Sequence, residues 1–212
     1  MIVKELKFSI EDVKAVEILA KNSSIDFSTD TDEIIVRILE ESEGGIIKKI
    51  GEYEAYIDDG KLVLAFSNLS GEISIPKDIE IDNFTLMCSK SSADISGPFK
   101  TKDIIINARE SSIDMSDVDF IGNMDVNVKM TSLDINIDYL GMGGNTVSLN
   151  SKMTSASIGL GISSNIDVEV SYESTAMSSV DVDGRLHVEN PTGKLNINLN
   201  VKMSSIDIEI LR

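Results

Sequence analysis

A short phrase that recurs seven times constrains the fold of this chain more than any other feature. Each copy has two small hydroxyl residues, an apolar residue, usually an aspartate, and a second apolar residue. The copies begin at Asn22, Lys90, Glu110, Met130, Met153, Met177 and Met203. From the second copy on they lie 20, 20, 23, 24 and 26 residues apart. Repeats of this length are typical of stacked architectures, in which each unit buries its apolar face against its neighbours.

The hydrophobic period around each copy is two, which indicates β-strands. In the fourth repeat, alternating apolar residues stand on both sides of Thr131-Ser132, namely Met124, Val126 and Val128 before it and Leu133, Ile135 and Ile137 after it. The phase shifts by one residue at Thr131-Ser132, so we expect a corner there between two short strands. Stacked copies then form an all-β, parallel β-solenoid with rungs of about 20–26 residues, roughly 4.8 Å apart.

The repeats predict one domain, residues 1–212. Residues 73–212 hold the regular repeats, and residues 1–72 hold less regular N-terminal rungs and a hairpin that turns at Asp59-Gly60. The 68 residues between the first two copies equal about three rungs, so we expect the stack to continue through them. The glycines at 141–144 and 159–161 are interpreted as turns.

Stacking would place equivalent aspartates in one column: Asp94, Asp114, Asp134, Asp181 and Asp207, interrupted by Ser157 and with Asp26 upstream. Like charges about 5 Å apart repel by roughly 1 kcal/mol per pair in water. Two interpretations stay open. The column is either a solvated acidic face, which we favour, or a weak site for a hard cation, which takes oxygen ligands. The calcium-loop repeat and the EF-hand loop are both absent.

Three further columns have structural interpretations. Stacked asparagine amides would hydrogen-bond one another along the axis, and the second hydroxyl of each corner would bond the backbone. Methionines at the first corner position would fill the core, with a copper(I) site as the minor alternative. The asparagines are Asn107, Asn127, Asn150 and Asn200, and the methionines are Met130, Met153, Met177 and Met203.

Composition excludes several function classes. A net charge of −17 argues against nucleic-acid or anionic-membrane partners, which need clustered cations. No run approaches the ~18 apolar residues of a membrane helix. The single cysteine, Cys88, excludes an internal disulfide and is expected in the core, and the single histidine, His187, is expected at the surface. We identify no catalytic residues and no cofactor.

The first residues carry charges at Lys4, Glu5 and Lys7, where a signal peptide needs an apolar run. We therefore expect a cytoplasmic protein. A surface location stays open if a leader has been removed.

Three stretches together resemble the putative-adhesin family of β-strand-repeat domains of unknown function. They are Tyr56–Leu62, Ile73–Ile79 and the repeated Ser-Ser-x-Asp-Ile units, and the resemblance extends from about Phe8 to Ile210. It implies a β-solenoid with no established activity, so no catalytic residues carry over. The adhesin label implies surface exposure.

We therefore predict a non-enzymatic interaction or scaffolding module. The alternatives are a self-assembling, filament-forming protein and a polysaccharide-active β-helix enzyme. The enzyme is disfavoured because the chain has no Trp and only four Tyr. The final copy, Met203–Arg212, is a full-strength strand at the end of the repeats. We expect it to leave an open edge for self-association.

Overall fold

A computed structural model describes residues 2–39, 51–77, 79–163, 165–175 and 177–212. Over these residues the chain is all-β, as the sequence predicts, with a 3-10 turn, η1 (Ile10–Asp12), and no α-helix. The described part accordingly holds no helix long and apolar enough to cross a bilayer. The sequence also predicts a break in the strand pattern at Glu41-Ser-Glu-Gly44-Gly45, and these residues lie outside the described ones.

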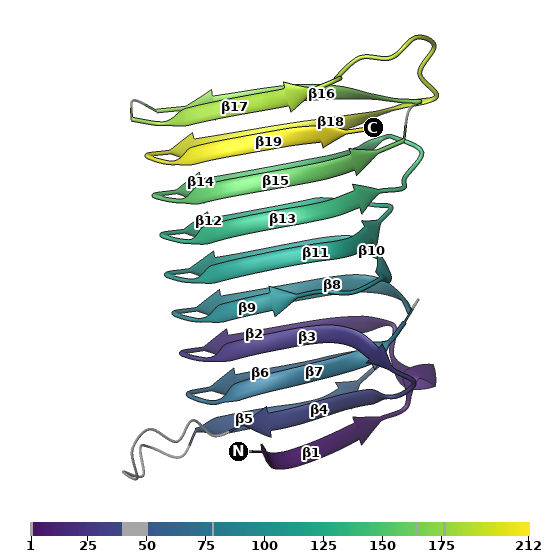
Figure 1. Ribbon diagram of the computed structural model, residues 1–212, viewed down its shortest axis with the longest axis vertical. Helices are drawn as coiled ribbons and strands as arrows, with labels where there is room; N and C mark the ends of the chain where they lie inside the picture. Colours follow the sequence, from purple (N-terminus) through teal and green to yellow (C-terminus); the bar gives the residue numbers. More distant parts are fainter. Residues whose placement is uncertain (1, 40–50, 78, 164, 176) are drawn as a thin grey trace.

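The strands form two long ladders whose inner surfaces face each other (Figure 1). We call the first the asparagine sheet. From one end of the stack to the other it contains β5 (Glu52–Asp58), β6 (Lys61–Ser67), β2 (Ala15–Lys21), β8 (Glu80–Ser89), β10 (Phe99–Arg109), β12 (Met124–Lys129), β14 (Asn145–Lys152), β18 (Gly193–Lys202) and β16 (Ile166–Ser174). Every pair is parallel except β5–β6.

We call the second ladder the aspartate sheet. It contains β1 (Ile2–Phe8), β4 (Ile34–Leu39), β7 (Ser70–Pro76), β3 (Ser24–Thr31), β9 (Ser92–Ile95), β11 (Ser112–Phe120), β13 (Ser132–Tyr139), β15 (Ser155–Ile162), β19 (Ser205–Leu211) and β17 (Ser179–Gly184). From β7 to β17 all pairs are parallel, and only β1–β4 and β4–β7 are antiparallel. Each predicted corner joins a strand of the asparagine sheet to one of the aspartate sheet, and we call such a pair a rung.

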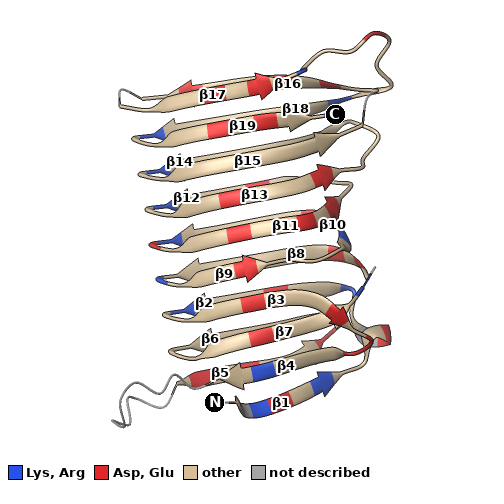
Figure 2. Cartoon of the chain, in the orientation of Figure 1, with Lys and Arg blue, Asp and Glu red and all other residues tan. Residues whose placement is uncertain are grey.

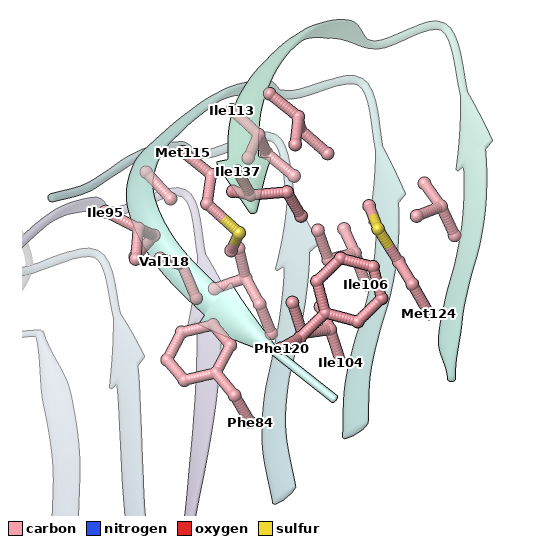
Figure 3. Packing of buried hydrophobic residues seen from close by; sticks show 14 of the residues in the cluster. Phe84, Ile95, Ile104, Ile106, Ile113, Met115, Val118, Phe120, Met124 and Ile137 are labelled. Atoms are coloured by element: carbon pink, nitrogen blue, oxygen red, sulfur yellow. The ribbon is translucent and has the colours of Figure 1, made fainter. Parts of the chain in front are cut away.

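The core is the space between the two ladders. Alternation places one apolar column after another inside, as along Ile113, Leu133, Ala156 and Ile206, which are paired rung to rung and buried. Figure 3 shows this packing around Ile113, Met115 and Phe120. The rings of Phe27, Phe84 and Phe99 pack together in the core with centroids 5.4 to 5.6 Å apart.

At the C-terminal end, the order of the rungs differs from the order of the sequence. The last strand, β19, pairs with β15 on one side and with β17 on the other. Val180, of the sixth copy, therefore ends the apolar column beyond Ile206, of the seventh. The prediction that the final copy leaves an open edge is wrong, because the chain turns back and inserts it between two earlier copies.

At the N-terminal end the first two copies are direct neighbours, since Ser24 pairs with Ser92 and Asp26 with Asp94. The 68 residues between them do not separate these rungs, contrary to expectation. They instead build the other end of the stack: β4, the predicted hairpin β5–β6, and the rung β6–β7. The hairpin turns at Asp59 (φ 45°) and Gly60 (φ 76°), as predicted.

The rung β6–β7 contains an eighth corner that the sequence pattern did not reveal. Asn68 occupies its first position, and Gly71, Glu72 and Ile73 pair with Ile25, Asp26 and Phe27 of the first copy. The hidden copy reads Asn-Leu-Ser-Gly-Glu-Ile, so it keeps the first Asn, one serine, an acid and an apolar end. Leu69 and Gly71 depart from the pattern, because the other copies have a hydroxyl residue and an apolar residue at these positions. Gly71 is required because a Cβ there would meet the Phe66 ring at 2.7 Å.

The turns predicted at the two glycine-rich segments have different outcomes in the structure. The segment around Gly143 and Gly144 is a turn with positive φ, as expected. Gly159 and Gly161 instead lie within β15, so the prediction of a turn there is wrong. A Cβ on Gly161 would lie 1.7 Å from an oxygen of the Asp138 side chain, so the absence of a side chain makes room for this carboxylate on the next rung.

Candidate functional site: the corner ladders

The corners are held by one geometry repeated along the stack. The first residue of each copy has a positive φ, between 48° at Asn22 and 70° at Met177. This left-handed conformation reverses the chain within one residue. In successive rungs its amide donates to the last residue of a neighbouring rung's strand, as from Met130 to the Lys152 carbonyl at 2.9 Å. The corners are thus cross-linked as well as stacked.

The first hydroxyl of each corner, not the second, bonds the backbone. Ser91 Oγ donates to the Ser89 carbonyl at 2.9 Å, and Ser204 Oγ donates to the Lys202 carbonyl at 2.9 Å. These hydroxyls are buried and also accept from the next rung, as from the Ser23 amide to Ser91 Oγ at 3.2 Å. The sequence-based assignment to the second serine is wrong because strand alternation turns that serine outward.

The second serines and the aspartates form two exposed rows along the aspartate sheet. Ser92 Oγ donates to Ser24 Oγ at 3.0 Å, and Ser179 and Ser205 hydroxyls lie 3.0 Å apart. Two residues further along each strand, the carboxylates line up rung after rung (Figure 2). In spatial order this acidic column is Glu72, Asp26, Asp94, Asp114, Asp134, Ser157, Asp207 and Asp181.

The structure brings the predicted aspartates together in register, with Asp181 and Asp207 exchanged in order. Burial, and then the charges of Asp134 and Asp94, raise the pKa of Asp114 above its usual value. The central carboxylates therefore do repel one another. Among the described side chains of the column, only Glu72 has an ion-pair partner, Arg37 at 3.8 Å.

The described residues contain no group of three or more His, Cys, Asp or Glu side chains placed to hold a metal ion. The acidic column is a line of single carboxylates on flat strands, whereas a hard cation takes six or more oxygens around one point. Whether the column binds a cation weakly stays a prediction.

The methionine column lies at the solvent-exposed tip of the corners, so the prediction that it fills the core is wrong. Met130, Met153 and Met203 are 37 to 40% exposed and Met177 is 82% exposed. The left-handed residue adds one position to the chain between the strands. Its side chain therefore points away from both sheets, whatever the parity of the strand before it.

A basic column runs beside the methionines and was not recognised from the sequence. The last residues of four consecutive strands of the asparagine sheet pair in register: Arg109, Lys129, Lys152 and Lys202. In Figure 2, Lys and Arg residues recur at the tips of the rungs. Arg109 contacts Glu110 at 3.0 Å. The three lysines have no ion pair with any described residue. The available signal was a basic residue five positions before most positions of the acidic column, although not before Glu72, Asp94 or Asp181.

The remaining predicted residues have structural roles. Asn127 donates to Asn107 at 3.3 Å and Asn150 donates to Asn127 at 2.9 Å, which confirms the asparagine ladder over three rungs. Cys88 is buried, and burial raises the pKa of its thiol to about 12. His187 is at the surface, where its Nδ1 lies 3.1 Å from Asp167.

The end of the stack beyond β19 is partly covered by residues 185–192. Leu186 packs against the core, and its carbonyl accepts from the Val168 amide at the edge of β16 at 2.9 Å. The Arg212 guanidinium fixes this segment, because it donates to the carbonyls of Arg185 and Leu186 and to those of Ser163 and Ile166, at 2.6 to 3.1 Å. The described part of β17 pairs with β19 alone, so its outer edge is free of strands.

No family model matches the chain, and no curated protein matches it. Solved structures of similar fold exist. A putative cell adhesion protein from Clostridium sporogenes has a TM-score of 0.53 at 11% identity, with 98% of each chain covered. A putative adhesin from Bacteroides fragilis has a TM-score of 0.48 at 12% identity, with 97% of this chain and 96% of the other covered. Putative adhesins, which the sequence resembles, are thus also found among the solved structures. At 11% identity, the Clostridium sporogenes structure shows a similar fold and nothing beyond it.

Proposed function

We propose that the protein is a non-enzymatic, adhesin-like β-solenoid scaffold that binds a macromolecular partner along the aspartate sheet. The observation that carries this proposal is the pair of exposed rows, one of serine hydroxyls and one of carboxylates, repeated in register from rung to rung. Such rows offer many equivalent weak contacts along one line. They suit an extended or repetitive partner better than a small molecule, which binds in a concave pocket.

The chemistry of the rows selects a cationic partner. Unpaired carboxylates at roughly 4.8 Å spacing create a negative potential along the column, and the pKa of Asp114 is raised by burial and then by the charges of Asp134 and Asp94. A partner with repeated amines or guanidinium groups would relieve this repulsion at several rungs at once, and linked contacts add affinity through effective concentration.

Two other functions have less support. A polysaccharide-active enzyme needs acids that converge on one bond about 5–10 Å apart, whereas these acids are distributed along a column. A filament grown end to end is favoured by the free edge of β17. It is disfavoured by residues 185–192, which Arg212 holds beside β16, the end strand of the asparagine sheet.

Binding of poly-L-lysine, measured by isothermal titration calorimetry, tests the proposal. We expect the triple variant Asp94→Asn, Asp114→Asn and Asp134→Asn to raise the Kd at least about tenfold, since a tenfold change corresponds to about 1.4 kcal/mol. The matched control is Asp82→Asn, Asp125→Asn and Glu173→Gln, which removes the same charge from exposed positions on the asparagine sheet.

Equal weakening in the two triple variants would mean that only net charge matters, and the proposal would fail. Release of reducing ends from polygalacturonate by the wild-type protein would instead support the enzyme alternative.

A further inference from the structure

The acidic column and the basic column have the same spacing because both are built from the same rungs. In the rungs of the third, fourth and seventh copies, the basic residue lies five positions before the acid: Arg109 and Asp114, Lys129 and Asp134, Lys202 and Asp207. The fifth copy has Lys152 with Ser157. The corner separates the members of each pair onto different sheets, and no ion pair joins them within the molecule. Two columns of opposite charge and equal spacing thus lie on either side of the corners, unpaired with each other.

We propose that a second copy of this chain is the partner of the aspartate sheet, with the basic column of one copy lying along the acidic column of the other. The proposal rests on the function proposed above and names the partner of that same surface. Parallel stack axes would bring Arg109, Lys129 and Lys202 opposite the acids of the equivalent rungs with no shift between copies, and Lys152 opposite Ser157. A two-fold axis parallel to the stack makes this contact reciprocal. Two-fold symmetry is the commonest symmetry of homo-oligomers, and its interfaces are self-complementary.

The methionines add apolar area at the same corners. Met130, Met153 and Met203 are exposed beside Lys129, Lys152 and Lys202. Flexible thioethers adapt to irregular surfaces and are frequent at binding faces. In the pairing of two copies they would approach the row of second serines, which precedes the aspartates by two residues. The contact is then an apolar ridge bordered by ion pairs.

The net charge of −17 opposes association but does not prevent this contact. At 0.15 M ionic strength the Debye length is about 8 Å, so charges further apart are largely screened. Pairs in direct contact are screened less. The columns therefore favour association at physiological salt, where the remaining repulsion between copies is weak.

A charge exchange across the two columns tests the proposal by sedimentation velocity over a concentration series. The basic-column variant carries Arg109→Glu, Lys129→Glu and Lys202→Glu, and the acidic-column variant carries Asp114→Lys, Asp134→Lys and Asp207→Lys, so that every substituted residue has its counterpart in the other variant. We expect the wild type to dimerise and each variant alone to have a dimer Kd at least about tenfold higher. Mixing the two variants should restore association, because each column again meets its opposite charge.

The control is Lys14→Glu, Lys100→Glu and Lys102→Glu, which makes the same charge change at exposed lysines near the opposite ends of β2 and β10. It should leave dimerisation within about threefold of wild type. Circular dichroism melting first establishes that each variant is folded. Any variant that is unfolded is replaced by a version with Gln or Asn at the same positions. These neutral versions should weaken the dimer, and mixing them should not restore it.

Three results would overturn the proposal: a wild-type protein that stays monomeric over the series, a control variant as impaired as the basic-column variant, or folded charge-exchange variants that fail to associate when mixed. If the wild type is monomeric and yet poly-L-lysine binding depends on the aspartates, the aspartate sheet binds a cationic partner other than a second copy. If neither occurs, the proposed function fails as well.

Discussion

Substituting alanine for Val201 or for Val182 tests the order of the last two rungs. In the structure this order is the reverse of the order in which the two copies follow each other in the sequence. Val201 on β18 is fully buried and lies in the penultimate rung, although it belongs to the last repeat. Val182 on β17 is half-buried in the terminal rung, although it belongs to the repeat before. The two substitutions remove the same two methyl groups, so only the surroundings differ.

The magnitude follows from burial. Two buried methyl groups are worth roughly 1.6 kcal/mol of transfer free energy, and incomplete collapse of the cavity raises the cost of Val201→Ala to about 2–3 kcal/mol. A chain of this size loses about 2–4 °C per kcal/mol, so the melting temperature should fall by about 4–12 °C. Val182→Ala should cost less than about 1 kcal/mol, because its side chain already contacts solvent in the folded state.

Thermal and urea unfolding followed by far-UV circular dichroism measure both effects. Stability in stacked repeats is a sum of rung and interface terms, so a terminal rung has one interface and a penultimate rung has two. If Val182→Ala destabilised the protein as much as Val201→Ala, or more, the insertion of β18–β19 between β14–β15 and β16–β17 would be incorrect.

Four further predictions concern single features. Arg212→Ala should speed hydrogen exchange of the Val168 amide, because it frees the segment whose Leu186 carbonyl accepts that bond; unchanged exchange would show that the guanidinium does not hold the segment. Cys88, buried with a pKa raised to about 12, should react with iodoacetamide at pH 8 only after urea unfolding, and rapid native labelling would contradict its burial. Because the folded-state pKa of Asp114 is raised, its ionisation lowers stability as pH rises above the unfolded-state value of 3.8. Asp114→Asn should therefore raise the melting temperature at pH 7 but not at pH 3, and an equal shift at both would refute the repulsion. Calcium should raise the melting temperature no more than sodium at matched ionic strength, and a larger calcium effect would establish specific cation binding.

Much of the candidate site could be predicted from residue types and periodicity. Alternation places Asp114 and Asp134 outward and Ile113 and Leu133 inward, and the recurrence of the six-residue phrase puts each pair in register. The methionines and the corner hydroxyls could not be placed in this way. Their positions depend on the left-handed residue at each corner, which adds one position to the alternation. The basic column could not be predicted for a related reason, since its members lie before the corner and outside the recurring six-residue phrase.

The sequence by itself determined the unit of this protein: two short strands, an apolar inner side, polar columns outside and a tight corner. These are local properties, set by the alternation of side chains and by the chemistry of a few corner residues. Only the tertiary structure decided which copy stacks on which. The copies carry the same kinds of residue in the same columns, so the repeats alone do not fix the order in which they stack. The choice falls to segments outside the repeats, such as residues 185–192, which carry the chain back and let the seventh copy enter beneath the sixth.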